Sequence, residues 1–138
     1  MSVQPPVPPS SAPITLPREV YELLTLVDLT RTGRRVLDIL LAHQSEQTGA
    51  AKLSQAEMCA ILGASKPSVN RGFRELREIG LAWAIEDALY QLHPLLTGGR
   101  SVTRLAAVPK IKVPAVEEVG EQRRQRYAAQ LASLGLSA

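Results

Sequence analysis

The sequence predicts a mainly α-helical fold with one small β-hairpin, in a chain of 138 residues that has room for a single domain. Three observations predict this class. Apolar residues recur at helical spacing in three segments between residues 30 and 80, glycines follow the last two of these stripes, and a short alternating run comes next. Hydrophobic residues make up 45% of the chain and aromatic residues only 4%, so the expected core is mostly aliphatic.

The first two segments differ in how clearly their sequence indicates a structure. Residues 1–13 hold five of the ten prolines and no charge, which predicts a disordered Pro-rich tail rather than a docking segment. Residues 16–29 fit either a short helix or an edge strand, because their apolar side chains match both periods. A clear helical stripe follows, with Thr30 or Thr32 as its cap and Gly49 as its stop signal.

A pair of helices is predicted next, with a tight turn between them. Ser54 followed by Glu57 fits a capping box at the first helix start, and Gly63 suits a turn that needs positive φ. Pro67 is tolerated in the first turn of the second helix, because its missing N–H has no helical partner there. Gly80 ends that helix, and its buried side consists of Val69, Phe73, Leu76 and Ile79.

Beyond this pair the sequence predicts a hairpin, a basic segment and a last helix. The run LAWAIEDALYQLHP alternates on both sides of Glu86 and Asp87, and Pro94 closes its second half. We expect one domain over residues 14–98, a basic linker over 99–116 and a C-terminal helix over 117–135. The linker is either a flexible arm on phosphates or an ordinary connection. The C-terminal helix packs on the domain or on a second copy, so a homodimer stays open.

The order of these elements is that of a winged helix-turn-helix, in which the second helix of the pair enters the DNA major groove. Residues 53–81, LSQAEMCAILGASKPSVNRGFRELREIGL, resemble the helix-turn-helix of bacterial winged-helix DNA-binding proteins. The order is also similar to that of winged-helix plasmid replication and maintenance proteins, where a Tyr in the second wing strand precedes Asn-Pro and a glycine. Tyr90, His93, Pro94 and Gly98 stand in those places, with His replacing Asn.

Two residue choices depart from that pattern. Gly72 lies inside the second helix of the pair, where glycine costs about 1 kcal/mol relative to alanine. Close packing against the preceding helix would compensate for this cost. The hairpin tip carries Glu86 and Asp87, which phosphate groups would repel, so we expect a mainly structural wing.

The second helix of the pair presents polar side chains opposite its apolar stripe. Arginine can bind guanine and asparagine can bind adenine with two hydrogen bonds each, which makes Asn70, Arg71 and Arg74 the candidate base readers. Flanking cations and the start of the preceding helix suit phosphates. The predicted DNA-binding residues are Ser54, Gln55, Ser65, Lys66, Ser68, Asn70, Arg71, Arg74 and Arg77.

A simpler interpretation competes with DNA binding for the same charged face. Arg71 and Glu75, and likewise Arg74 and Glu78, are spaced as i,i+4 pairs that would solvate an exposed helix. The capping box, the glycine turn and the hairpin around this helix favour DNA binding instead. A winged helix used only for protein contacts would suit the acidic tip but not the cations.

The sequence indicates no enzyme, so we expect no catalytic residue, no cofactor and no metal. The two histidines lie far apart in the chain, Cys59 falls on an apolar stripe, and no phosphate-binding loop or metal-ligand cluster appears. One cysteine excludes an internal disulfide, and neither a signal sequence nor an apolar run of about 20 residues is present. We therefore expect a cytoplasmic, nucleoid- or plasmid-associated protein without a membrane partner.

The expected partner is double-stranded DNA, and the net charge of +3 suits a polyanion. Residues 95–113 carry +4, so the remainder of the chain sums to −1. The first functional prediction is sequence-specific binding at origin or control sites in plasmid replication or maintenance, with recruitment of host replication machinery. The alternative is a transcriptional repressor that binds a promoter operator and affects the transcription machinery.

Overall fold

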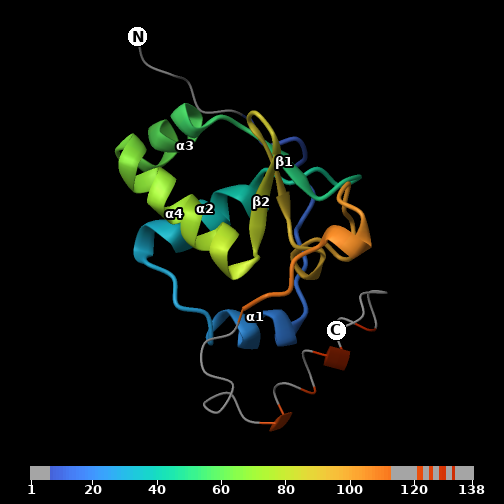
Figure 1. Cartoon of the computed structure of the whole chain (residues 1–138). Helices are drawn as coiled ribbons and strands as arrows, with labels where there is room; N and C mark the ends of the chain where they lie inside the picture. The colour runs from blue at the N-terminus through green and yellow to red at the C-terminus, as the bar shows by residue number, and fades with distance from the viewer. Residues whose placement is uncertain (1–6, 113–120, 123–124, 126–127, 130–131, 133–138) are drawn as a thin grey trace.

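The computed structural model describes residues 7–112, 121–122, 125, 128–129 and 132, and within them the chain has a mixed α/β fold (Figure 1). Within residues 7–112, four α-helices and three short strands follow one another in the order α1 (Arg18–Leu24), α2 (Arg31–Ala42), β1 (Ala50–Lys52), α3 (Gln55–Leu62), α4 (Lys66–Ile79), β2 (Ala82–Glu86) and β3 (Leu89–Leu92). Two 3₁₀ turns come after the sheet, at Pro94–Leu96 and Leu105–Ala107. Among the described residues, no helix is long and apolar enough to span a bilayer.

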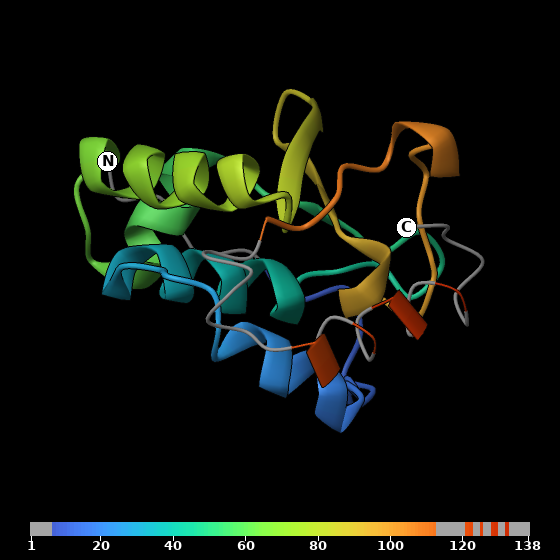
Figure 2. The same cartoon turned by 60° about the horizontal axis from the view of Figure 1, so that its bottom comes forward.

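Helix α2 lies at the centre of the molecule, between α4 on one side and α1 on the other (Figure 2). Its Leu37 and Leu40 are fully buried, as are Met58 of α3 and Leu76 of α4. Thr30 is the cap of α2, since its hydroxyl accepts a hydrogen bond from the Gly33 N–H at 3.1 Å. The ambiguous stretch before it forms helix α1, which buries one apolar face on the core.

The hairpin predicted around Glu86 and Asp87 is present as β2 and β3, but it belongs to a three-stranded antiparallel sheet in the order β1-β3-β2. Strand β1 was not predicted, because it has only three residues and its pairing partner lies about forty positions away. The assignment of Gly49 as a helix stop was wrong, because α2 ends at Ala42. Gly49 instead has φ 69° in the loop before β1, where a Cβ atom would lie 2.7 Å from the Arg100 carbonyl oxygen.

Helices α2 and α4 approach closely where two glycines meet. A Cβ atom on Gly72 would lie 3.1 Å from the backbone nitrogen of Gly33. Gly72 therefore compensates for its low helix propensity by close packing, but the partner is α2 and not the preceding helix α3 as expected. Beside this contact, the Glu75 carboxylate accepts hydrogen bonds from the Thr30 backbone N–H at 2.8 Å and from the Thr30 hydroxyl at 2.6 Å. Glu75 of α4 thus binds the cap residue of α2.

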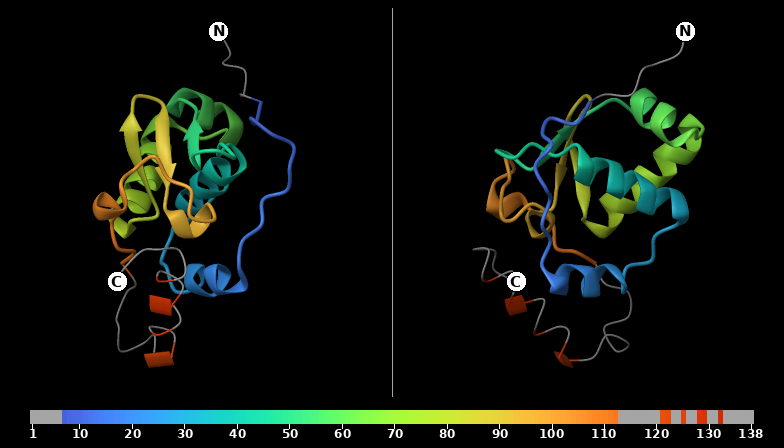
Figure 3. Two further views of the ribbon diagram at one scale, coloured as in Figure 1. Left: turned by 90° about the vertical axis from the view of Figure 1, so that its right-hand side faces the viewer. Right: turned by 180° about the vertical axis from the view of Figure 1, so that it is seen from behind.

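The basic segment after the sheet was predicted as a linker or flexible arm, but residues 99–112 pack on the domain (Figure 3). Ile111 is buried in the core, and the Lys112 N–H donates to the Ile79 carbonyl at 2.8 Å at the end of α4. The buried amide of Gln91 accepts from the Val102 N–H at 3.0 Å. These contacts depend on long-range hydrogen bonds that a local pattern does not indicate. The described part of this segment therefore belongs to the folded domain.

Two predicted segments fall wholly or partly on residues that the structure does not describe. Residues 1–6 of the predicted Pro-rich tail and most of the predicted helix over 117–135 lie outside the described residues. The described positions 121–122, 125, 128–129 and 132 have helical backbone. From residue 7 to α1, the chain runs along the outside of the domain (Figure 3).

Candidate nucleic-acid interface

Helices α3 and α4 form a rigid pair because each end of their connection is fixed by a local motif. Both hydrogen bonds of the capping box are present: the Ser54 hydroxyl accepts from the Glu57 N–H at 3.1 Å, and the Glu57 carboxylate accepts from the Ser54 N–H at 2.8 Å. Gly63 has φ 62° and ends α3. Ser65 caps α4 two residues later, with its hydroxyl accepting from the Ser68 N–H at 3.3 Å. The predicted capping box and glycine turn are therefore confirmed.

The face of α4 that points away from the core is polar and carries most of the predicted site. Val69, Phe73 and Leu76 are buried as predicted, and Ile79 is half-buried. The predicted residues exposed on the opposite side are Lys66, Asn70, Arg71, Arg74 and Arg77; Pro67 and Glu78 are also exposed there, and Ser68 is half-buried. Five of the predicted residues thus share one accessible helix face, which lies at one edge of the molecule (Figure 1).

The i,i+4 ion pairs considered for this face do not form. Within residues 7–112, neither Arg71 with Glu75 nor Arg74 with Glu78 comes within ion-pair distance, whereas Arg34 and Asp38 of α2 do, at 3.4 Å. The Glu75 carboxylate is directed to Thr30 instead. The guanidinium groups of Arg71 and Arg74 therefore keep all their hydrogen-bond donors available to another molecule.

Five of the predicted site residues also take part in hydrogen bonds within the protein. The hydroxyls of Ser54 and Ser65 accept capping hydrogen bonds, and the Ser65 hydroxyl donates to the Ser68 hydroxyl at 3.0 Å. Gln55, at the first position of α3, donates from its Nε2 to the Asn70 Oδ1 at 2.8 Å. This bond joins two predicted site residues that lie 15 positions apart in the chain. No pattern in the sequence indicates it, because it depends on how α3 crosses α4.

The hairpin presents an acidic tip, as the sequence predicts. Glu86 and Asp87 are exposed, and Ala88 adopts a positive φ of 58° to close the turn. The strand pairing shifts between Ala84 and Glu86, which leaves Ile85 39% exposed. On the other side of the sheet, the ring of Tyr90 packs on Phe73 of α4 with ring centroids 4.4 Å apart. Strand β3 of the hairpin therefore packs against the buried side of α4.

The basic segment contributes three accessible cations. Arg104, Lys110 and Lys112 are exposed. Arg100 differs, because its guanidinium group donates to the carbonyl oxygens of Thr97 and Glu46 and so holds two loops together. Lys110 passes beside the end of α4, where a Cβ atom on Gly80 would lie 2.8 Å from its carbonyl oxygen. The segment places its charge on the folded domain rather than on a free arm.

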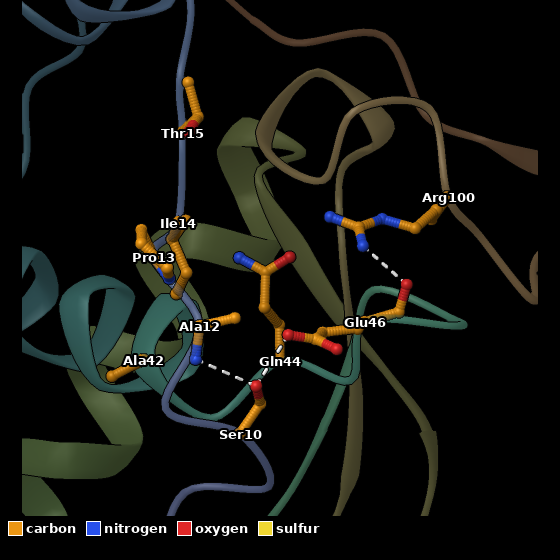
Figure 4. A pocket seen from close by; sticks show the side chains of 9 residues that line it. All are labelled: Ser10, Ala12, Pro13, Ile14, Thr15, Ala42, Gln44, Glu46 and Arg100. Carbon is orange, nitrogen blue, oxygen red and sulfur yellow. Dashed lines mark hydrogen bonds between the residues drawn. The ribbon is translucent and has the colours of Figure 1, made fainter.

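A cavity of about 310 Å³ lies between the N-terminal segment and the domain (Figure 4). Segment 10–15 forms one wall, and Gln44, Glu46 and Arg100 form the other. The Ser10 hydroxyl donates to the Glu46 carboxylate at 2.6 Å across it. The buried Gln44 Oε1 has no hydrogen-bond partner among the described residues. None of the residues that line this cavity belongs to α3 or α4, so the cavity is separate from the predicted site.

The histidines and the cysteine serve the fold. The buried His93 accepts from the Leu95 N–H at its Nδ1, so its Nε2 carries the proton and donates to the Pro109 carbonyl at 3.2 Å. Burial lowers the pKa of His93 to about 4, against a smaller opposing effect of the Pro109 bond. Burial also lowers the pKa of His43, partly offset by the charge of Glu57. Cys59 is half-buried against the core, and the described residues contain no cluster that could hold a metal ion.

Comparison with known proteins finds no family model, no curated protein and no solved structure that matches the chain.

Proposed function

We propose that the chain is a sequence-specific double-stranded DNA-binding protein of the winged helix-turn-helix type, with α4 as the helix that enters the major groove. The observation that carries this proposal is the accessible face of α4. Asn70, Arg71 and Arg74 project from a helix whose other face is buried, and within residues 7–112 no ion pair occupies the two guanidinium groups. Side chains of these types read base edges, and the major groove admits one α-helix.

The arrangement around α4 supports the same proposal. The capped α3 and the left-handed Gly63 give α4 a fixed angle, and α2 and β3 pack behind it. Such rigid support lowers the cost of ordering the reading side chains on binding. The cations at the flanks, Lys66 and Arg77, are exposed and suit phosphate contacts, which set the position of the helix without reading sequence. The acidic hairpin tip would be repelled by phosphate, so in this proposal the hairpin serves as support rather than as a DNA contact.

Selection from a random double-stranded library, followed by fluorescence anisotropy on the selected duplex, tests this function. Arg71→Ala and Arg74→Ala should each lower affinity for the selected duplex by about tenfold or more while affinity for random duplex changes little, because a bidentate base contact contributes roughly 1–3 kcal/mol of discrimination. Arg18→Ala, which removes an exposed arginine on α1, is the matched control and should bind like the parent chain. Equal binding by all three variants would contradict the assignment of α4.

The cellular role of this binding is a second part of the proposal. We propose action at plasmid origin or control sites, with promoter repression as the alternative. The similarity to replication proteins involves Tyr90, which lies in β3, and His93, Pro94 and Gly98, which lie in the turn after it. Mapping the bound sites in cells distinguishes the roles. Iterated repeats beside a replication origin support replication, whereas one palindrome over a promoter supports repression.

A further inference from the structure

The hydrogen bond between Gln55 and Asn70 joins a predicted DNA-contacting side chain of α3 to one of α4. Gln55 begins α3, and Asn70 lies one turn into α4 on the exposed face. The Gln55 Nε2 donates to the Asn70 Oδ1 at 2.8 Å. A free asparagine amide rotates about its last torsion and can exchange the places of its donor and its acceptor. With Oδ1 held by Gln55, the donor and the acceptor of Asn70 have fixed places.

Gln55 also lies close to the sheet. Burial raises the pKa of the Tyr90 phenol on β3, and the neighbouring Gln55 side chain partly offsets this rise. The Tyr90 ring is 7% exposed and packs on Phe73, one helical turn beyond Asn70 on α4. Three elements therefore meet in one chain of side chains that runs from Tyr90 through Gln55 to Asn70.

We propose that Gln55 is a positioning residue that fixes the Asn70 amide to read an adenine, an inference that rests on the proposed DNA-binding function. A carbonyl oxygen has two lone pairs, so Asn70 Oδ1 accepts from Gln55 with one and from adenine N6 with the other. The Asn70 Nδ2 then donates to adenine N7. Guanine is disfavoured, because its O6 acceptor would face the Asn70 Oδ1 acceptor.

This role differs from the phosphate contact predicted for Gln55 from the sequence. A phosphate contact would need the Gln55 Nε2 donors, and the structure directs one to Asn70 and places the amide against Tyr90. The two roles also have different consequences. A phosphate contact contributes equally on every DNA sequence and adds to the salt dependence, whereas a positioning role affects one base pair and depends on Asn70.

A double-mutant cycle on full-length protein separates these roles. Duplex selected from a random library, and copies of it with single base-pair changes, are titrated with the parent chain, Gln55→Ala, Asn70→Ala and the double variant. We expect Asn70→Ala to lose about tenfold or more discrimination at one A·T pair. Gln55→Ala should lose several-fold at the same pair with an unchanged salt slope, and it should have no further effect on specificity in the Asn70→Ala background.

The contrary result is equally specific. If Gln55→Ala weakens binding to every duplex by the same factor, lowers the salt slope and adds fully to Asn70→Ala, Gln55 contacts phosphate and the positioning role is wrong. Gln47→Ala, in an exposed loop, is the matched control for loss of a glutamine. Urea unfolding of each variant shows that a specificity change is not a loss of fold.

A measurement without DNA keeps this inference separate from the proposed function. In ¹⁵N spectra of the free protein, Gln55→Ala should shift the side-chain amide signals of Asn70, and Tyr90→Phe should shift those of Gln55. Unchanged Asn70 signals would overturn the Gln55–Asn70 hydrogen bond itself. If the signals shift but the parent chain selects no sequence from the library, the proposed DNA binding and adenine contact are wrong, whereas the Gln55–Asn70 hydrogen bond is still present.

Discussion

Removing the Glu75 carboxylate should destabilise the fold far more than the loss of a surface helix pair. In Glu75→Ala, the Thr30 N–H and hydroxyl lose acceptors at 2.8 and 2.6 Å, and the start of α2 loses a neighbouring negative charge. Hydrogen bonds to a charged group contribute about 1.5–3 kcal/mol each, and the lower value applies at this partly exposed position. In the variant, water can hydrogen-bond to the Thr30 donors and so offsets part of the lost stability. We therefore expect a loss of about 2 kcal/mol in the free energy of unfolding.

Urea unfolding monitored by circular dichroism measures this loss, with a constant m-value as the test that the two-state description holds. An i,i+4 pair with Arg71 would contribute only about 0.2–0.5 kcal/mol. Glu78→Ala, which changes an exposed glutamate on the same helix, and Arg71→Ala should each change stability by less than about 0.5 kcal/mol. If Arg71→Ala lowers the free energy of unfolding as much as Glu75→Ala does, or if Glu75→Ala is nearly neutral, then Glu75 does not stabilise the fold by joining α4 to α2.

Three further predictions follow from single features. The pKa of His93 is about 4 in the folded protein against an ordinary 6.5, so the unfolded chain takes up the proton first as the pH drops. The free energy of unfolding should therefore fall by up to about 3 kcal/mol through this interval. In urea titrations at pH 7 and pH 4.5, His93→Asn should show a smaller fall, and an equal fall would contradict this assignment. Gly72→Ala should lower the melting temperature despite alanine's helix propensity, because its Cβ would press on Gly33; a higher melting temperature would show that α2 and α4 can separate. Replacing Glu86 and Asp87 with their amides should leave the affinity and salt slope for the selected duplex unchanged, and several-fold tighter binding would place the tip near phosphate.

The parts of the fold that the sequence predicted are those fixed by contacts within a few residues. The capping box at Ser54, the left-handed Gly63 and Gly80, and Pro67 in the first turn of α4 each depend on neighbours no more than five positions away. The hairpin is local in the same sense, because its two strands are joined by a short turn. These motifs gave α3, α4 and the hairpin close to their observed bounds, and with them the exposed face of α4.

The parts that the sequence did not predict depend on pairings between distant residues. Strand β1 is recognisable only from its partner β3. The need for glycine at position 49 is likewise apparent only from the Arg100 carbonyl oxygen, which lies too close for a side chain there. Helical spacing suggested a partner for Glu75 on its own helix, but the actual partner, Thr30, lies 45 positions earlier. The Gln55–Asn70 bond is of the same kind. Residue type and spacing indicate which side chains share a face, but not which of them bind one another across two elements.

The use of acidic residues on α4 bears directly on the two interpretations of its charged face. In a simple solvated surface helix, the glutamates would pair with arginines of the same helix. The sequence offers two such i,i+4 pairs, Arg71 with Glu75 and Arg74 with Glu78. In the structure Glu75 instead joins α4 to the start of α2, and Glu78 forms no ion pair within residues 7–112. The exposed face of α4 therefore carries Lys66, Arg71, Arg74 and Arg77 with one exposed acid, Glu78, so most of its positive charge is uncompensated. Such uncompensated charge attracts a polyanion, and so it supports DNA binding over simple solvation.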